Sequence, residues 1–210
     1  MSETPVIQFL NKMADLILLN ALWILCCIPI VTIGASTTAM YYVLIRSIRY
    51  GDGYVVKMFF LSFKRDFKQS TFAWLIIVVL FCLLGMDLYF WYVLTEGVIA
   101  KVMLVLSLSV AFVIFITSLY IFPVIAKFEN TLYIHVKNAV AMAIGHFKHT
   151  TIILLIIAIF FYANYKTLAA NVIMLFIGFA LLAYILSFFF YSVFMNYMDE
   201  RYDDFYIDER

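Results

Sequence analysis

Residues 102–126 read VMLVLSLSVAFVIFITSLYIFPVIA and contain no charged side chain. A helix needs about 20 apolar residues to cross the hydrocarbon core of a bilayer, and a charge at its centre is costly. The stretch meets both conditions, so it predicts a transmembrane helix. The whole chain is similar, because 67% of its 210 residues are hydrophobic and 13% are charged, against about 25% charged in soluble domains. The sequence therefore predicts an all-α, polytopic helical bundle embedded in the lipid bilayer.

Charge-free stretches elsewhere in the chain predict four more spans, which gives about five transmembrane helices. One of these spans would extend through an aromatic belt of Tyr89, Trp91 and Tyr92 if Asp87 lies at the membrane interface. A tight turn separates the last two spans, so they are expected to form an antiparallel hairpin. The four stretches are residues 16–45, 69–86, 150–165 and 167–198.

The first stretch, residues 16–45, is too long for one upright helix and too short for two. Pro29 and Gly34 favour a break, and the Ser-Thr-Thr run at residues 36–38 offers a new N-cap. We expect a crossing over residues 14–34, followed by a second helix that runs along or out of the membrane. The alternative is that the stretch dips into the membrane and returns.

Most of the 14 lysines and arginines lie in residues 46–68, in residues 127–149 and in the C-terminal tail. Short cytoplasmic loops hold the excess of basic residues, so these segments and the C-terminus are expected in the cytoplasm. A single crossing by the first stretch places the N-terminus outside, together with Lys12, Lys101 and Lys166. If the first stretch folds back, Lys12 moves to the inside. The charge distribution is compatible with both topologies.

Two short segments resemble each other, because residues 67–71 read FKQST and residues 147–151, 80 positions later, read FKHTT. Each segment opens an apolar span and follows an amphipathic stretch, which predicts two cytoplasmic amphipathic helices. An internal duplication with halves 14–95 and 102–170 would explain this spacing. Parallel repeats of this kind occur in transporters, but also in proteins that transport nothing. The apolar residues of the two stretches are Val56, Phe59, Phe60, Phe63 and Phe67, and Leu132, Val136, Val140, Ile144 and Phe147.

We interpret residues 1–198 as a single transmembrane domain and residues 199–210 as an acidic cytoplasmic tail. The chain contains no Gly-rich phosphate loop, no metalloprotease motif and no arrangement typical of a nucleophile. Its net charge of +1 gives no indication of nucleic-acid binding. We therefore expect neither an enzyme nor a cofactor.

The three histidines are His135, His146 and His149, and the last two are spaced as neighbours on one helical face. Such a pair occurs in metal sites, but no carboxylate or thiol stands nearby in the sequence to complete one. We expect no metal, and we expect all three histidines on the solvated surface of a cytoplasmic helix.

Several short segments together indicate a family. They are residues 20–23 (NALW), 27–29 (CIP), 32–35 (TIGA), 38–39 (TA) and 63–69 (FKRDFKQ), followed by Pro123 and Asn130. The chain resembles, over nearly its whole length, the YesL-like membrane proteins, which are classed as domain of unknown function 624. The resemblance implies a multi-pass protein of the bacterial cytoplasmic membrane in Gram-positive bacteria, often encoded beside carbohydrate ABC importers and their sensor kinases. It implies no established activity, so no catalytic or binding residue can be transferred.

The hypothesis that follows is an accessory or regulatory component of a carbohydrate uptake or sensing system. Such a protein would dock on an ABC importer or sensor-kinase subunit through its two amphipathic helices. The alternative is a small transporter or channel built on the duplicated unit, with Pro29 and Pro123 marking broken helices at a shared site. In either case the candidate functional residues are Pro29, Thr32, Gly34, Thr38, Pro123 and Asn130.

Overall fold

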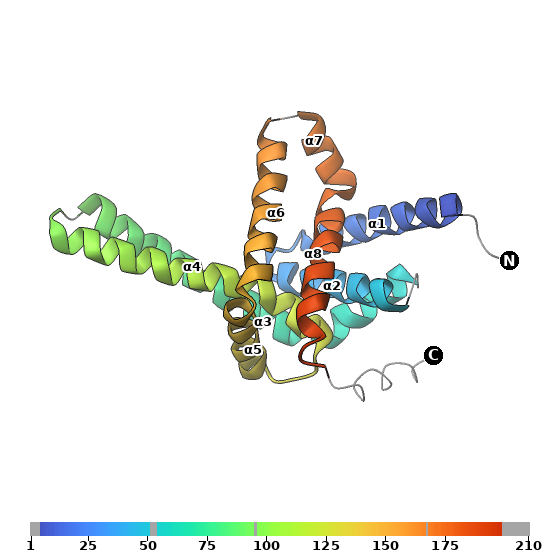
Figure 1. The fold of residues 1–210 in the computed structure, drawn as a ribbon, viewed down its shortest axis with the longest axis horizontal. Helices are drawn as coiled ribbons and strands as arrows, with labels where there is room; N and C mark the ends of the chain where they lie inside the picture. The colour runs from blue at the N-terminus through green and yellow to red at the C-terminus, as the bar shows by residue number, and fades with distance from the viewer. Residues whose placement is uncertain (1–4, 51–53, 95, 167, 199–210) are drawn as a thin grey trace.

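A computed structural model describes residues 5–50, 54–94, 96–166 and 168–198, and every regular element within these ranges is helical (Figure 1). The expected all-α fold is confirmed. The acidic tail, residues 199–210, lies outside the described residues.

The first two helices, α1 (Pro5–Cys27) and α2 (Ile33–Tyr50), fold back on each other as a hairpin (Figure 1). Lys12 of α1 and Arg46 of α2 line the same cavity, so the two ends of the segment 16–45 lie together. A single crossing would separate these residues by the thickness of the membrane. The structure therefore favours the fold-back over the single crossing.

The break between α1 and α2 occurs at Pro29, as the sequence predicted. Pro29 has an extended backbone with φ −75° and ψ 111°, and a single 3-10 turn, η1 (Ile30–Thr32), follows it. The Thr32 hydroxyl donates to the carbonyl oxygen of Cys26 at 2.6 Å, which satisfies an acceptor left free where α1 ends. The expected N-cap at residues 36–38 is wrong, because α2 has already begun at Ile33.

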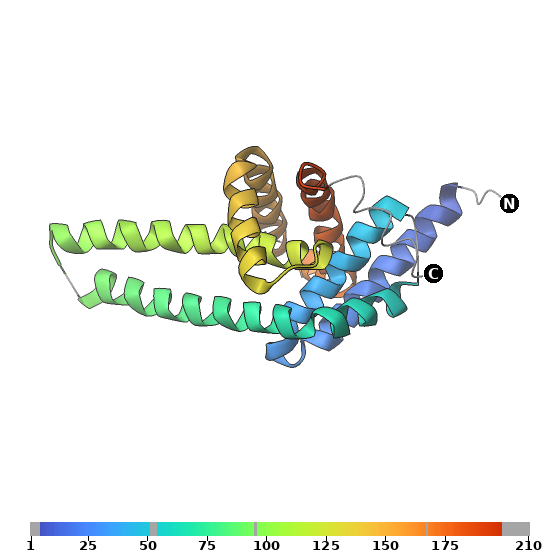
Figure 2. The ribbon, with the colours of Figure 1, turned by 90° about the horizontal axis from the view of Figure 1, so that it is seen from below.

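The third and fourth helices, α3 (Val55–Tyr89) and α4 (Val98–Lys127), form a long hairpin that we call the arm. The arm extends away from the remaining helices (Figures 1 and 2). A π-helical turn, η2 (Phe90–Leu94), follows α3, and Gly97 begins the return with a φ of 106°, which favours glycine. The first expected amphipathic helix is not a separate element, because α3 is one continuous helix of 35 residues that includes it.

The C-terminal helices form a second hairpin that stands across the arm (Figure 1). Its two long helices lie side by side and run in opposite directions, which confirms the antiparallel pair expected from the sequence. A short helix at the base of the arm, α5, corresponds to the second expected amphipathic helix. The elements are α5 (Leu132–Gly145), α6 (Phe147–Lys166), α7 (Leu168–Ile173), the π-helical η3 (Met174–Gly178) and α8 (Phe179–Phe194).

The two hairpins and α2 meet in an aromatic core. The Phe190 ring of α8 makes edge-to-face contacts with Tyr41 of α2 and Tyr120 of α4, with ring centroids 5.6 and 5.0 Å apart. Phe128 and Phe194 form a third contact at 5.3 Å. Such ring pairs stabilise the packing beyond the effect of burial alone. They hold α2, α4 and α8 together at the centre of the molecule.

Away from this core, the side chains of both hairpins are apolar and exposed. Leu83 and Val105 on the arm are 54% and 60% exposed, and Ile159 on α6 is 67% exposed. Soluble proteins rarely present apolar patches of this extent to water. Within the described residues, five helices are long and apolar enough to cross a membrane, which supports a multi-pass membrane protein. They are Val6–Cys27, Val55–Val93, Val98–Lys127, Phe147–Lys166 and Asn171–Phe194.

Candidate functional site

A stripe of residues on one face of α2 builds a polar interface with α3. Residues four positions apart in a helix lie on the same face, and Gly34, Thr38, Tyr42 and Arg46 follow this spacing. They face α3, which contributes hydroxyl, guanidinium and carboxylate groups. We call this interface the polar seam, defined by Gly34, Thr38, Tyr42 and Arg46 of α2 with Ser62, Arg65, Asp66 and Ser70 of α3.

At one end of the polar seam, Gly34 brings the two helices into close contact. A Cβ atom at this position would lie 2.3 Å from the carbonyl oxygen of Ser70 and 2.7 Å from the Cβ of Trp74. Close approach of backbones through small residues is a common way for membrane helices to pack. The Trp74 indole Nε1 also donates to the carbonyl oxygen of Ile30 at 2.9 Å, so α3 satisfies an acceptor in the break after Pro29.

In the middle of the polar seam, two buried hydroxyl groups meet. Thr38 Oγ1 and Ser70 Oγ lie 2.8 Å apart, and both residues are completely buried. A buried hydroxyl without a partner would be costly, and this hydrogen bond removes that cost for both groups. The pair therefore fixes which turn of α2 faces which turn of α3.

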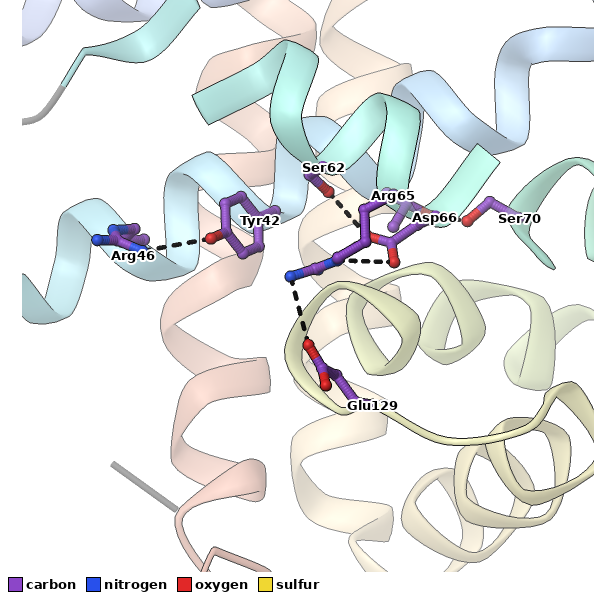
Figure 3. Close-up of polar contacts among 8 residues, drawn as sticks. Tyr42, Arg46, Ser62, Arg65, Asp66, Ser70 and Glu129 are labelled. Carbon is purple, nitrogen blue, oxygen red and sulfur yellow. Dashed lines mark hydrogen bonds and ion pairs between the residues drawn. The ribbon is translucent and has the colours of Figure 1, made fainter. Parts of the chain in front are cut away.

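At the other end, charged groups surround Tyr42 (Figure 3). The Arg65 guanidinium lies over the Tyr42 ring, 4.8 Å from its centroid, while Arg46 Nη1 donates to the Tyr42 hydroxyl at 3.2 Å. Arg65 also makes two hydrogen bonds to the Asp66 carboxylate, at 3.0 and 2.8 Å, and Ser62 Oγ donates to the same carboxylate at 3.0 Å. The Arg65 and Asp66 charges are thus paired with each other, although both side chains remain partly exposed.

The loop between α4 and α5 closes the polar seam. Glu129 lies 3.9 Å from the Arg65 guanidinium (Figure 3), and Gln69 Nε2 donates to the carbonyl oxygen of Asn130 at 2.9 Å. These contacts connect α3, which carries Arg65 and Gln69, with the start of α5. The seam therefore joins three parts of the molecule that lie far apart in the sequence.

The expectation that His135 is a surface residue is wrong, because its side chain is only 1% exposed. Burial lowers the pKa of His135 below its usual value of 6.5, and a hydrogen bond with the Asn130 backbone and the negative charge of Asp66 oppose this shift. His146 and His149 are half-buried, and their ring centroids lie 6.0 Å apart. The expectation assumed that the apolar residues of α5 point inward and its histidine points outward. In the structure, the face of α5 that carries His135 points inward.

The structure brings some of the predicted functional residues together and leaves others apart. Gly34, Thr38 and Asn130 lie at the polar seam, and Pro29 lies in the adjoining break. Thr32, already described, also lies in this break. Pro123 is buried inside continuous α4, so the second broken helix expected there is absent from the described residues.

Tyr42, Arg65, Asp66 and Ser70 were not among the candidate functional residues, although the segments 63–69 and 67–71 contain the last three. Two signals were present, namely the four-residue spacing along α2 and the charged pair within residues 63–69. Neither is specific, because positive-inside bias alone accounts for charges at this position.

A second feature missed from sequence is a clip between α1 and the π-helical turn η3. The Asn20 side chain is completely buried; its Nδ2 donates to the Leu175 carbonyl at 2.8 Å, and its Oδ1 accepts from the Ala180 backbone N–H at 3.0 Å. A π-helical turn disturbs the regular backbone pairing of a helix. Asn20 satisfies one donor and one acceptor there, and it ties α1 to the C-terminal hairpin.

The apolar faces predicted for the amphipathic stretches are largely exposed. On α3 only Phe59 is buried and Phe63 partly buried, because the inward face carries Ser62, Asp66 and Ser70 for the polar seam. On α5 the inward face carries His135, Ala139, Met142 and Ala143 instead. The exposed apolar residues are Val56, Phe60 and Phe67 on α3, Val136 and Ile144 on α5, and Phe147 at the start of α6.

The polar seam lies within a segment of the chain that matches a known protein-family model. Residues 16–88 match the family model described as "Protein of unknown function, DUF624". The match confirms the resemblance to domain of unknown function 624 over α1 from Leu16, all of α2 and nearly all of α3. No curated protein and no solved structure matches the chain.

Proposed function

We propose, from the match of residues 16–88 to the DUF624 family model, that this chain is an accessory membrane component of a carbohydrate uptake or sensing system. It docks on an importer or sensor-kinase subunit through the exposed faces of α3 and α5. The resemblance to YesL-like proteins suggests the kind of system. The structure supports the docking part of the proposal.

The observation that carries the proposal is the combination of exposed apolar and basic side chains on these two faces. On the first turns of α3, Phe60 and Phe67 are exposed beside Lys57, Lys64 and Lys68. The α5 face repeats this pattern. Exposed apolar groups rimmed by polar ones are typical of interaction sites on proteins. What we call the α5 face consists of Val136, Lys137 and Ile144 on α5, together with Phe147 and Lys148 at the start of α6.

The proposal includes an orientation in the bacterial cytoplasmic membrane. With the α1–α2 fold-back, the N-terminus, the α3 face and the α5 face are all on the basic side. Basic loops remain in the cytoplasm, so both docking faces and both termini are cytoplasmic in this proposal. The turn at Gly97 and the end of α6 at Lys166 are then outside.

Photo-crosslinking in intact cells tests the docking proposal. A photoreactive residue in place of Lys57 or Lys137 should yield adducts with importer or sensor-kinase subunits. The matched control is Lys101, an exposed lysine at the first turn of α4, which lies at the other end of the arm. Adducts with lipid alone from positions 57 and 137, or the same protein adducts from position 101, would contradict the proposal.

One observation favours a second function, a small transporter built on a duplicated unit. The buried hydroxyl pair of Thr38 and Ser70 has a counterpart 80 residues later, where Thr150 Oγ1 lies 2.8 Å from the Tyr120 hydroxyl. Ser70 and Thr150 occupy equivalent positions of the two similar segments. Uptake of labelled sugars by purified protein in liposomes tests this function, and no uptake across a panel of sugars would remove it.

A further inference from the structure

We propose that the cavity between the N-terminal half of α1 and the C-terminal half of α2 binds the phosphate-bearing headgroup of an anionic membrane lipid. This inference is independent of the docking function, because the cavity lies between the helices and not on the exposed faces of α3 and α5.

The walls of the cavity have the two-part chemistry of a lipid site. Lys12 and Asp15 of α1 and Arg46 and Ser47 of α2 form its polar side. Leucine and valine side chains from the two helices, with Met58 of α3, form its apolar side. A headgroup with the start of its acyl chains combines the same two kinds of surface.

The charges of the cavity favour an anion. Two cations, Lys12 and Arg46, and one carboxylate, Asp15, line it, so its side chains carry a net positive charge. Basic pockets between membrane helices on the cytoplasmic side are a recurrent form of anionic lipid site.

Both cations are held in position by aromatic partners. The Lys12 ammonium lies over the Tyr184 ring, 5.0 Å from its centroid, and Arg46 donates to the Tyr42 hydroxyl at 3.2 Å. A site whose groups are already oriented loses less conformational entropy when the ligand binds. An anion should therefore bind more tightly to this cavity than to a pair of freely moving surface lysines.

The size of the cavity fits a headgroup phosphate. Its volume is about 40 Å³, whereas a single water needs about 10–15 Å³ on a comparable measure. The space is thus that of a few waters, which a phosphate group with its four oxygens can replace. The lining also includes the partly exposed Met58 and Tyr184, against which the start of an acyl chain can lie, whereas free phosphate cannot use these apolar groups.

Native mass spectrometry of the delipidated full chain in detergent tests the proposal. The protein is titrated with dioleoyl phosphatidylglycerol, with dioleoyl phosphatidylcholine and with inorganic phosphate. We expect one tightly bound phosphatidylglycerol per chain and at least about tenfold weaker binding of the other two. Loss of one charge-assisted contact in Lys12→Gln or Arg46→Gln should weaken phosphatidylglycerol binding about tenfold.

The matched control is Lys101→Gln, which removes a lysine from the first turn of another span and should leave binding unchanged. Arg46 also contributes to the polar seam, so Lys12→Gln and Ser47→Ala decide the question if Arg46→Gln does not fold. Unchanged affinity in Lys12→Gln, equal binding of phosphatidylcholine, or equal binding of inorganic phosphate alone would overturn the proposal.

Discussion

At the scale of single residues, the polar seam depends on a few groups whose replacement should destabilise the packing of α2 on α3. Gly34 leaves room for the Ser70 carbonyl, Thr38 and Ser70 satisfy each other, and Asp66 neutralises Arg65. Thr38 and Ser70 are completely buried, so removal of either hydroxyl leaves the other without its partner in a low-dielectric interior, which is costly. The residue scale is therefore where the packing of α2 on α3 is decided.

Gly34→Ala should destabilise the protein by about 1–3 kcal/mol, because its Cβ would overlap the Ser70 backbone and force the helices apart. Unfolding by SDS in mixed micelles measures the effect. Gly85→Ala is the matched control on α3, since a Cβ at this position meets nothing within 4 Å. Equal effects of the two substitutions would show that the close approach at Gly34 contributes nothing.

The buried His135 should make stability depend on pH. Its pKa is lowered in the folded protein, so the unfolded chain takes up a proton at higher pH than the folded one. The free energy of unfolding should therefore fall as the pH drops below about 6.5, and His135→Gln should remove this part of the decrease. His149→Gln should keep it. A full wild-type pH dependence in His135→Gln would contradict the assignment.

At the scale of helices, the sequence predicted well which helices exist but predicted poorly which of their faces point inward. Charge-free length located four of the five spans, and Pro29 located the break, because both follow from the cost of exposing backbone or charge in lipid. The first span was misplaced, because it was expected over residues 14–34, whereas the candidate span is Val6–Cys27 and includes Lys12 and Asp15. The predictions of which faces of α3 and α5 point inward were wrong. Hydrophobic periodicity identifies the inward face only when the core is apolar and the outside is water. Here α3 turns Ser62, Asp66 and Ser70 inward because α2 offers them partners.

The π-helical turn η3 should depend on Asn20. Asn20→Leu keeps the number and branching of side-chain heavy atoms but leaves the Ala180 N–H and the Leu175 carbonyl without their side-chain partner, which costs about 1–3 kcal/mol. Hydrogen exchange of residues 174–180 should become faster. Asn196→Leu is the control, because Asn196 is exposed. Unchanged exchange in Asn20→Leu would show that the turn is stable without the clip.

At the scale of the whole molecule, the arm and the C-terminal hairpin stand across each other (Figures 1 and 2). Both are exposed and apolar along their free lengths, so both favour the hydrocarbon layer. Transmembrane helices are tilted by about 20° on average from the bilayer normal. We therefore expect the angle between the hairpins to close in a flat bilayer, with the loop between α4 and α5 as the joint.

Distance measurements between spin labels test this expectation. Labels at Ile99, in the first turn of α4, and Tyr165, in the last turn of α6, report the separation of the two hairpin tips. In lipid nanodiscs the distance should be shorter than in the structure described here. A distance in nanodiscs that matches the crossed arrangement would show that the hairpins keep it in the membrane.

In the proposed topology, residues 16–45 fold back and place the N-terminus on the same, cytoplasmic side as the proposed docking faces. Cysteine accessibility tests it most directly, with Gln8→Cys, Lys57→Cys and Ile99→Cys introduced separately after the three native cysteines are replaced. With a membrane-impermeant maleimide, positions 8 and 57 should react only from the cytoplasmic side and position 99 only from outside. Labelling of position 8 from outside, with position 57 inside, would contradict the fold-back and restore the single crossing.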